Sequence, residues 1–225
     1  MFPPMPIKFH QPITYLITAG TTPRADTPTT EEFAYTLTLV ERGVAAGVTL
    51  IQLREKDLSA RALYQLTLRA AQITRGSATH LLVNDRSDIA RAAGADGVHL
   101  TAQSLDAAVV RSTYGKDFLI GVSTHSLAEA QAARAGGADF ATFGPVFDTP
   151  SKRAYGQPLG TTTLAEAARL VAPFPFLALG GVTLENAREV FWAGAQGIAA
   201  IRLFGDAQNL NEVIDAIKNA ATEIT

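Results

Sequence analysis

Short apolar runs alternate with amphipathic segments along the whole chain. Four segments resemble one another, because each joins an Ala-rich stretch, a Gly and an apolar run: "AAGVTLIQLR", "AAGADGVHL", "RAGGADFATFG" and "WAGAQGIAAIR". This order is typical of a helix end followed by a strand. Four more apolar runs lie at 14–18, 80–85, 118–124 and 176–181. Together the two sets predict eight strands.

The segments between these strands have the features of helices. Segment 29–47 opens with Thr and acidic residues, and segment 126–137 has Ser126 and Glu129 at the spacing of a capping box. Segments 184–195 and 209–224 carry apolar residues at helical spacing. The strands are short and apolar on both faces, which suits a buried parallel sheet.

Eight strand-helix units in a chain of this size predict one α/β domain, a single (β/α)₈ TIM barrel over residues 1–225. Residues 1–12, rich in Pro, are expected to form an irregular N-terminal extension. The alternative is a doubly wound open sheet, but no strand-helix turn carries its G-x-G-x-x-G fingerprint.

Composition favours a globular protein and gives no sign of a nucleic-acid-binding, thiol-dependent or membrane-spanning one. With 47% apolar and 18% charged residues, the 225-residue chain suits a globular protein with a large core. The net charge of −2 gives no reason to expect nucleic acid or an anionic membrane as partner. The absence of cysteine excludes thiol nucleophiles and Cys-based metal sites. The chain has neither a signal-peptide pattern at its start nor an apolar run of membrane-spanning length, so we expect a cytoplasmic protein.

Polar residues cluster where the second strand ends, in "IQLREKD". Gln52, Arg54 and Lys56 are two residues apart, so an extended strand would point all three to one side. Two cations and an amide at a barrel mouth favour a polyanion site, since Arg and Lys both bind phosphate oxygens. The alternative is an ion pair with Glu55 or Asp57.

The third strand ends in "LLVNDRSD". Asn84 and Asp85 there could bind a phosphate oxygen and Mg²⁺, respectively. The alternative is a helix cap, because Asn and Asp are favoured at helix starts. Next to the cations of the second strand, the pair favours a metal-diphosphate site.

Two histidines have competing interpretations. His99 lies inside the fourth strand, which favours a packed core residue over a catalytic one. The fifth strand ends in "GVSTHS", which supplies Ser123 and His125. His125 could act as a base, or it could simply precede the N-cap Ser126 of the next helix.

The loop "FGPVFDTPSKRAYGQPLG", 143–160, has no helical or strand period. Thr149, Ser151 and Lys152 supply two hydroxyls and an ammonium, and the length of the connection favours a lid. The last two strands end near Gly180–Gly181 and Arg202, where barrels of this fold commonly bind phosphate. Two anion sites in one mouth predict a diphosphate substrate and a monophosphate substrate.

Six segments occur in an order that resembles thiamine phosphate synthase and its TenI-like relatives: "QLREK", "VND", "GVSTHS", "FGPVFDTPSK", "LGGV" with a following Asn, and "AGAQGIAAI". The resemblance implies a homo-oligomeric, Mg²⁺-dependent transferase of thiamine biosynthesis. Such an enzyme joins 4-amino-2-methyl-5-hydroxymethylpyrimidine diphosphate to 4-methyl-5-(2-phosphoethyl)thiazole. The implied mechanism is dissociative: diphosphate leaves, a pyrimidine carbocation forms, and the thiazole nitrogen captures it.

The resemblance also implies roles for individual residues. Gln52 would contact the pyrimidine, Asp85 would bind Mg²⁺, and Ser123 would lie near the pyrimidine and the leaving group. The diphosphate would be bound by Arg54, Lys56, Asn84 and Lys152, of which Lys56 and Lys152 would act in catalysis together with Ser123. The thiazole phosphate would be bound by Thr149, Ser151, Gly181, Ile201 and Arg202.

Two positions depart from the family pattern. Where the family has H-x-G-Q-x-D, this chain continues "HLTAQSLD", which puts Ser104 at the second metal position, with Asp106 as a more distant candidate. Arg202 stands where the family commonly has Ser, and it could either bind or block the phosphate. Two alternative functions therefore stay open: a TenI-like thiazole tautomerase, whose members tend to carry His where Pro145 stands, and a non-catalytic ligand-binding relative.

Overall fold

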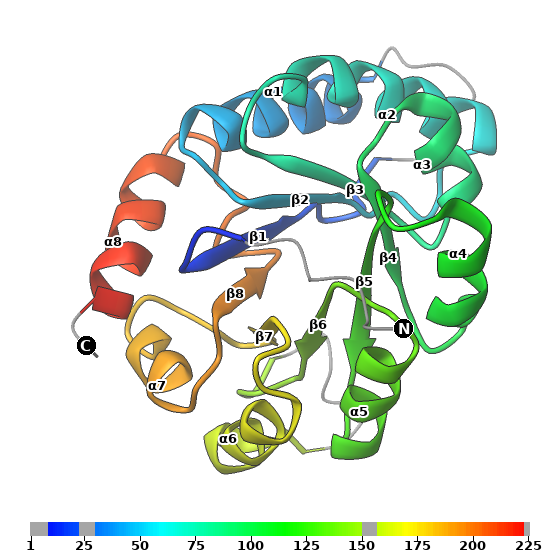
Figure 1. Ribbon diagram of the computed structural model, residues 1–225. Coiled ribbons are helices and arrows are strands. Elements are labelled where there is room, and N and C mark those ends of the chain that lie inside the picture. Colours follow the sequence, from blue (N-terminus) through cyan, green and yellow to red (C-terminus); the bar gives the residue numbers. More distant parts are fainter. Residues whose placement is uncertain (1–8, 23–29, 150–156, 223–225) are drawn as a thin grey trace.

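The apolar runs form eight parallel strands that close into a barrel, with the helices packed around it (Figure 1). The computed structural model describes residues 9–22, 30–149 and 157–222. The order of the strands follows the sequence, and β1 pairs with both β2 and β8. The strand bounds are β1 Ile13–Ile17, β2 Leu50–Leu53, β3 His80–Asn84, β4 Gly97–Leu100, β5 Leu119–Thr124, β6 Phe140–Phe143, β7 Phe176–Leu179 and β8 Gly197–Ala200. The predicted TIM barrel is confirmed.

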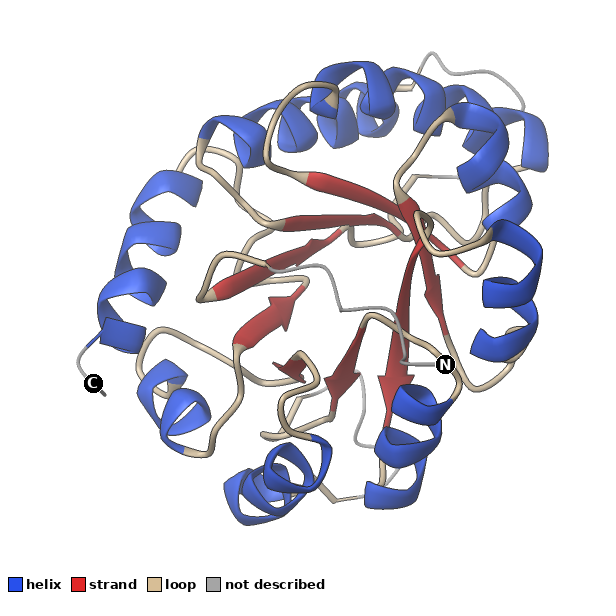
Figure 2. Ribbon diagram, in the orientation of Figure 1, coloured by secondary structure: helices blue, strands red, loops and turns tan. Residues whose placement is uncertain are grey.

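A helix follows each strand, and Figure 2 shows the helices as an outer ring around the strands. The helix bounds are α1 Glu31–Ala45, α2 Ala60–Thr74, α3 Ser87–Ala93, α4 Ala107–Tyr114, α5 Leu127–Ala135, α6 Gly160–Val171, α7 Ala187–Trp192 and α8 Leu210–Thr222. The hydroxyl of Ser126 accepts a hydrogen bond from the Glu129 amide, which confirms Ser126 as the N-cap of α5. The Glu129 carboxylate accepts from the amide of His125 instead of Ser126, so the predicted capping box is formed only in part. Among the described helices, none is long and apolar enough to cross a membrane.

Alternate residues of each strand fill the barrel interior, and the others pack under the helices. The interior cluster is Ile13, Tyr15, Ile17, Leu50, Leu82, Leu119, Phe140, Leu177 and Ala199. The three β1 residues of this cluster are two apart, as the pleat requires, and six other strands contribute one residue each. Toward the carboxyl end, the next inward position is polar in β2, β3 and β6, and β5 has Gly121 and then Ser123. The interior therefore changes from apolar to polar toward one mouth.

Glycine allows the strands to approach at the seam of the barrel. A Cβ at Gly197 of β8 would lie 2.1 Å from the carbonyl oxygen of Ile13 in β1, so a larger residue would push the two strands apart. At the amino-terminal end, the Phe9 ring lies against Phe140, with 6.0 Å between the ring centres. Phe9 therefore covers the interior cluster at this end, and the polar strand-end groups lie at the opposite end.

Several strands end earlier than the apolar runs suggest. β3 ends at Asn84 because Asp85 has a φ of 64°, and β7 ends at Leu179 because Gly180 and Gly181 have φ values of 94° and 67°. Left-handed residues cannot continue a strand. These turns place the strand-end residues in the loops of the barrel mouth.

Candidate active site

The end of β2 places an amide inside the barrel mouth. Gln52 is 2% exposed, and its side-chain nitrogen donates to the Oδ1 atom of Asn84 at the end of β3, at 3.0 Å. The side-chain oxygen of Gln52 is buried and, within the described residues, has no hydrogen-bond partner. A buried acceptor without a donor costs stability, so this oxygen is suited to a donor on a ligand.

The prediction that one strand face carries Gln52, Arg54 and Lys56 is wrong beyond Gln52, because Arg54 and Lys56 both follow the end of the strand. β2 ends at Leu53, and Lys56 lies exposed in the following turn. The buried Glu55 carboxylate accepts from the Thr18 hydroxyl and the Thr22 amide. In the part of the chain that the structure describes, Arg54 has no carboxylate partner, so the alternative of an Arg54–Glu55 ion pair is not supported.

Asp85 follows β3 in a conformation that is uncommon for a residue with a side chain. Its φ is 64°, and its amide donates to the carbonyl of His99 in β4 at 2.9 Å. Helix α3 begins at Ser87, with Arg86 as its N-cap and no side-chain capping bond. The alternative role of Asn84 and Asp85 as helix caps is therefore wrong, and the Asp85 carboxylate is exposed at the mouth.

A buried hydrogen-bonded chain crosses the barrel below the mouth. The Tyr15 hydroxyl lies 3.0 Å from His99 Nδ1, and His99 Nε2 lies 2.9 Å from the Ser123 hydroxyl. Burial lowers the pKa of His99 to about 3, so the imidazole is neutral near neutral pH. His99 is buried as predicted, but it also contacts a candidate site residue. Tyr15 was not predicted from the sequence, where its only signal was a phenol at an inward position of the first strand.

His125 lies outside this chain of contacts. It precedes the N-cap Ser126, its amide donates to the Glu129 carboxylate, and its ring bonds to the carbonyl of Gly144. These contacts join the start of α5 to the end of β6. The helix-flanking interpretation of His125 is supported by this geometry.

The loops after β6, β7 and β8 meet on the other side of the mouth. The Arg202 guanidinium donates to the buried Thr149 hydroxyl at 3.0 Å. A Cβ at Gly181 would lie 2.6 Å from the carbonyl oxygen of Asp148, so the two loops are in close contact. The Asn186 side chain donates to the carbonyl of Gly181 and accepts from the Thr183 amide, which holds the β7 loop in shape.

Of three further predicted residues, the structure describes one, Ile201. Ile201 directly follows β8 and packs against the interior cluster. Ser151 and Lys152 lie outside the described residues. The connection after β6 ends where α6 begins, at Gly160, the last residue of the predicted loop.

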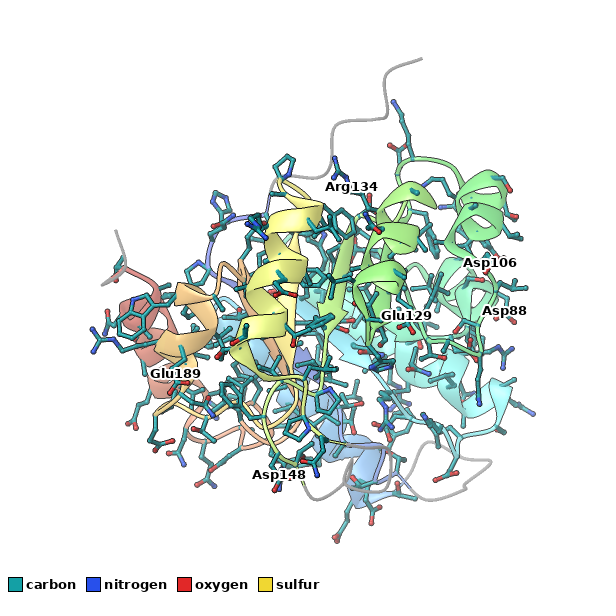
Figure 3. The ribbon with its side chains drawn as sticks, turned by 90° about the horizontal axis from the view of Figure 1, so that it is seen from below. Asp88, Asp106, Glu129, Arg134, Asp148 and Glu189 are labelled. Atoms are coloured by element: carbon teal, nitrogen blue, oxygen red, sulfur yellow. The ribbon has the colours of Figure 1, made fainter. Side chains whose placement is uncertain are left out.

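The two candidates for a second metal ligand lie in the loop after β4. The Ser104 hydroxyl accepts from the Thr101 amide at 2.8 Å, and exposed Asp106 is the N-cap residue of α4. Figure 3 shows Asp106 near the outer helices and well away from Asp148. Within the described ranges, no group of three or more His, Asp or Glu side chains could hold a metal ion.

The closed barrel and its polar mouth define a (β/α)₈-barrel enzyme, and sequence comparison shows which family. Residues 22–204 match the family model described as thiamine monophosphate synthase. The chain belongs to this family, and its role is in thiamine biosynthesis, as a transferase that acts on small molecules.

Individual relatives support this assignment. The chain is 50% identical to a putative thiamine-phosphate synthase of Geobacter sulfurreducens over 73% of this chain and 77% of the relative. It is 43% identical to the thiamine-phosphate synthase of Chlorobium phaeovibrioides over 76% of this chain and 82% of the relative. Among solved structures, thiamine phosphate pyrophosphorylase from Pyrococcus furiosus superposes with a TM-score of 0.76 at 29% identity, covering 94% of this chain and 96% of that one.

Proposed function

We propose that this enzyme joins 4-amino-2-methyl-5-hydroxymethylpyrimidine diphosphate to 4-methyl-5-(2-phosphoethyl)thiazole, giving thiamine phosphate and diphosphate. The observation that carries the proposal is the division of the mouth into two polar regions. One contains Gln52, Arg54, Asn84 and Asp85, and the other contains Thr149, Gly181 and Arg202. Membership of the thiamine monophosphate synthase family supports the choice of these two substrates.

The first region suits the pyrimidine diphosphate. The unpartnered Gln52 oxygen can accept from the exocyclic amine of the pyrimidine. The Arg54 guanidinium, which has no carboxylate partner among the described residues, can bind diphosphate oxygens together with the Asn84 amide. Exposed Lys56 lies in the turn after β2, where its ammonium can follow the diphosphate. We expect Lys152 to contribute a further cation.

The donor set at Asp85 fits a Mg²⁺ ion that is held largely by substrate. Mg²⁺ usually keeps several waters and binds through one or two carboxylates plus substrate phosphates, so a single exposed Asp85 carboxylate is sufficient. Bound there, the ion would neutralise charge on the departing diphosphate. Ser104 and Asp106 remain candidate contributors through water.

The second region suits the thiazole phosphate. Thr149 and Arg202 offer a hydroxyl and a guanidinium that already contact each other, and Gly181 and Ile201 offer backbone amides at the ends of β7 and β8. We expect Ser151 to add a second hydroxyl. An arginine at this point would bind the phosphate with two parallel hydrogen bonds and so add affinity for a dianion.

In this proposal the protein positions two substrates and stabilises charge. The carbon–oxygen bond of the pyrimidine diphosphate breaks, its electron pair leaves with the diphosphate, and the thiazole nitrogen supplies the electron pair of the new bond. The leaving group would be stabilised by Arg54, Lys56 and Ser123, and we expect Lys152 to act with them, because preorganised donors lower the barrier most effectively. Fixing the thiazole phosphate at the second region brings its nitrogen to the cation before water reaches it.

The test is the formation of thiamine phosphate from the two substrates by purified protein, followed over a Mg²⁺ titration with an EDTA control. We expect activity that disappears with EDTA and saturates only at high Mg²⁺, because Asp85 is the single carboxylate assigned to the ion. Thiazole phosphate binding without any turnover would contradict the transferase and favour a non-catalytic relative. Conversion of a thiazole tautomer without use of the diphosphate would favour the TenI-like alternative.

A further inference from the structure

Three side chains from different strands form one hydrogen-bonded chain inside the barrel. Tyr15 of β1 and His99 of β4 are 0% and 2% exposed, and Ser123 of β5 lies at the mouth end of the chain. The atoms that meet are Tyr15 Oη and His99 Nδ1 at 3.0 Å, and His99 Nε2 and Ser123 Oγ at 2.9 Å. The Phe140 ring packs against both aromatic rings, with centres 5.4 and 6.0 Å apart, so the rings are held in place.

The direction of these hydrogen bonds follows from the number of donors. His99 is buried and no described carboxylate lies within salt-bridge distance of it, so it carries a single N–H, because an unpaired buried charge is costly. The Tyr15 hydroxyl has His99 Nδ1 as its single partner among the described residues. If Nδ1 carried the proton, the phenol O–H would be buried without an acceptor, which costs stability. Tyr15 therefore donates to Nδ1.

The consequence reaches the mouth of the barrel. With Nδ1 as acceptor, the proton of His99 is on Nε2, and Nε2–H donates to the Ser123 oxygen. Because the Ser123 oxygen accepts from His99, the Ser123 O–H does not donate to His99. The Ser123 O–H can therefore donate to a ligand. In the opposite arrangement, Ser123 would donate to Nε2 and could offer a ligand only lone pairs.

We propose that Tyr15 and His99 are positioning residues that make Ser123 a hydrogen-bond donor to the departing diphosphate. The identity of the acceptor rests on the proposed function, but the direction of the hydrogen bonds does not. No proton is transferred in this step. The Ser123 hydrogen bond strengthens as negative charge grows on the diphosphate oxygen that receives the electron pair of the broken carbon–oxygen bond.

The first arm of the test reads the protonated nitrogen directly. In protein labelled with ¹⁵N-histidine, long-range ¹H–¹⁵N NMR spectra distinguish the two neutral forms, and His99→Gln identifies the His99 signals among the 4 histidines. We expect Nε2–H in the wild type, with a shift of the Nδ1 signal in Tyr15→Phe, which loses the donor but keeps the ring. An Nδ1–H form in the wild type would overturn the proposal. This reading needs no turnover and is independent of the proposed function.

The second arm measures whether Tyr15 acts through Ser123. We expect Tyr15→Phe to lower kcat and the affinity for inorganic pyrophosphate by about tenfold, the effect of one hydrogen bond, with the KM for the thiazole phosphate unchanged. Ser123→Ala should lower kcat and the pyrophosphate affinity further. Adding Tyr15→Phe to the Ser123→Ala variant should change neither kcat nor the pyrophosphate affinity. Equal losses in both backgrounds would show a structural role instead. Tyr64→Phe, which removes an exposed hydroxyl from α2, is the matched control.

If the wild type forms no thiamine phosphate, the proposed function fails, and the pyrophosphate arm still decides the role of Tyr15. Pyrophosphate affinity that is the same in wild type, Tyr15→Phe and Ser123→Ala would then overturn the proposal. A tenfold loss confined to the background with Ser123 would uphold it.

Discussion

At the scale of single residues, Asp85 combines an unfavourable backbone with an exposed carboxylate. Its φ of 64° costs most residues with a side chain about 1 kcal/mol, whereas Asn and Asp adopt this conformation more readily. Strain of this kind is often found where a side chain must be directed at a ligand. The bond from its amide to the carbonyl of His99 fixes the turn, so the exposed carboxylate is held directly after the end of β3.

Replacing the carboxylate without changing the backbone tests this residue. We expect Asp85→Asn to lower kcat by roughly 100-fold or more and to weaken the Mg²⁺ dependence, because the ion loses its charged ligand. The free energy of unfolding should change by less than about 0.5 kcal/mol, since Asn tolerates the left-handed region. Steady-state kinetics over a Mg²⁺ titration and urea unfolding measure the two effects.

Asp88 provides the control for this substitution. It is an exposed carboxylate three residues further along, and it is paired with Arg86 at 2.6 Å. Its pKa is lowered, mainly by the hydrogen bond from Arg86. Asp88→Asn should leave the Mg²⁺ dependence unchanged. Wild-type kinetics in Asp85→Asn would remove Asp85 from the metal site.

At the scale of elements, the loop after β7 and the loop after β6 depend on each other. The Phe147 amide donates to the carbonyl of Gly180, and the Val146 amide donates to that of Leu179, so the β6 loop runs along the β7 loop. The space for this contact exists because Gly181 has no side chain. The second polar region therefore requires both loops in their present positions.

The substitution Gly181→Ala tests this dependence. Its Cβ would collide with the carbonyl oxygen of Asp148 at 2.6 Å, so we expect the β6 loop to shift and the KM for the thiazole phosphate to rise about tenfold. The left-handed φ adds a loss of about 1 kcal/mol in stability. Gly94→Ala, at a φ of 76° with open space around the site, should show only the loss of stability that comes from the left-handed φ, and no change in KM. Equal kinetics in the two variants would contradict the contact.

At the scale of the whole molecule, closing the barrel buries a histidine that titrates normally in the unfolded chain. Burial lowers the pKa of His99 from 6.5 to about 3. Between these values the unfolded chain binds a proton that the folded protein does not bind. The free energy of unfolding therefore rises with pH in this window. The part that His99 contributes is fully present above about pH 6.5 and is lost progressively as the pH falls.

Urea unfolding as a function of pH, without metal or substrate, measures this linkage. We expect His99 to contribute a loss of roughly 2.5 kcal/mol in the free energy of unfolding between pH 7 and pH 4.5. In His99→Gln, the slope of stability against pH should decrease by up to one proton across this window. A slope unchanged by the substitution would mean that His99 is protonated in the folded protein.

Much of the architecture could be predicted from the sequence because it depends on local patterns. The eight apolar runs gave the eight strands, and Ser126 with Glu129 gave the start of α5. Strand ends were harder to locate, because the backbone at Asp85 and the turn at Lys56 depend on neighbouring strands and loops. The side on which Lys56 lies could not be decided by the alternation of residues, since alternation holds only while the strand continues.

The sequence by itself determined the barrel and most candidate residues of its mouth, because strand-end polar groups can be recognised from the apolar runs before them. Only the tertiary structure decided which of these groups meet. The contacts of Gln52 with Asn84, of Arg202 with Thr149, and of Tyr15 and Ser123 with His99 join residues 24 to 84 positions apart. Such contacts depend on barrel closure and on the inward direction of each side chain, which no local pattern records.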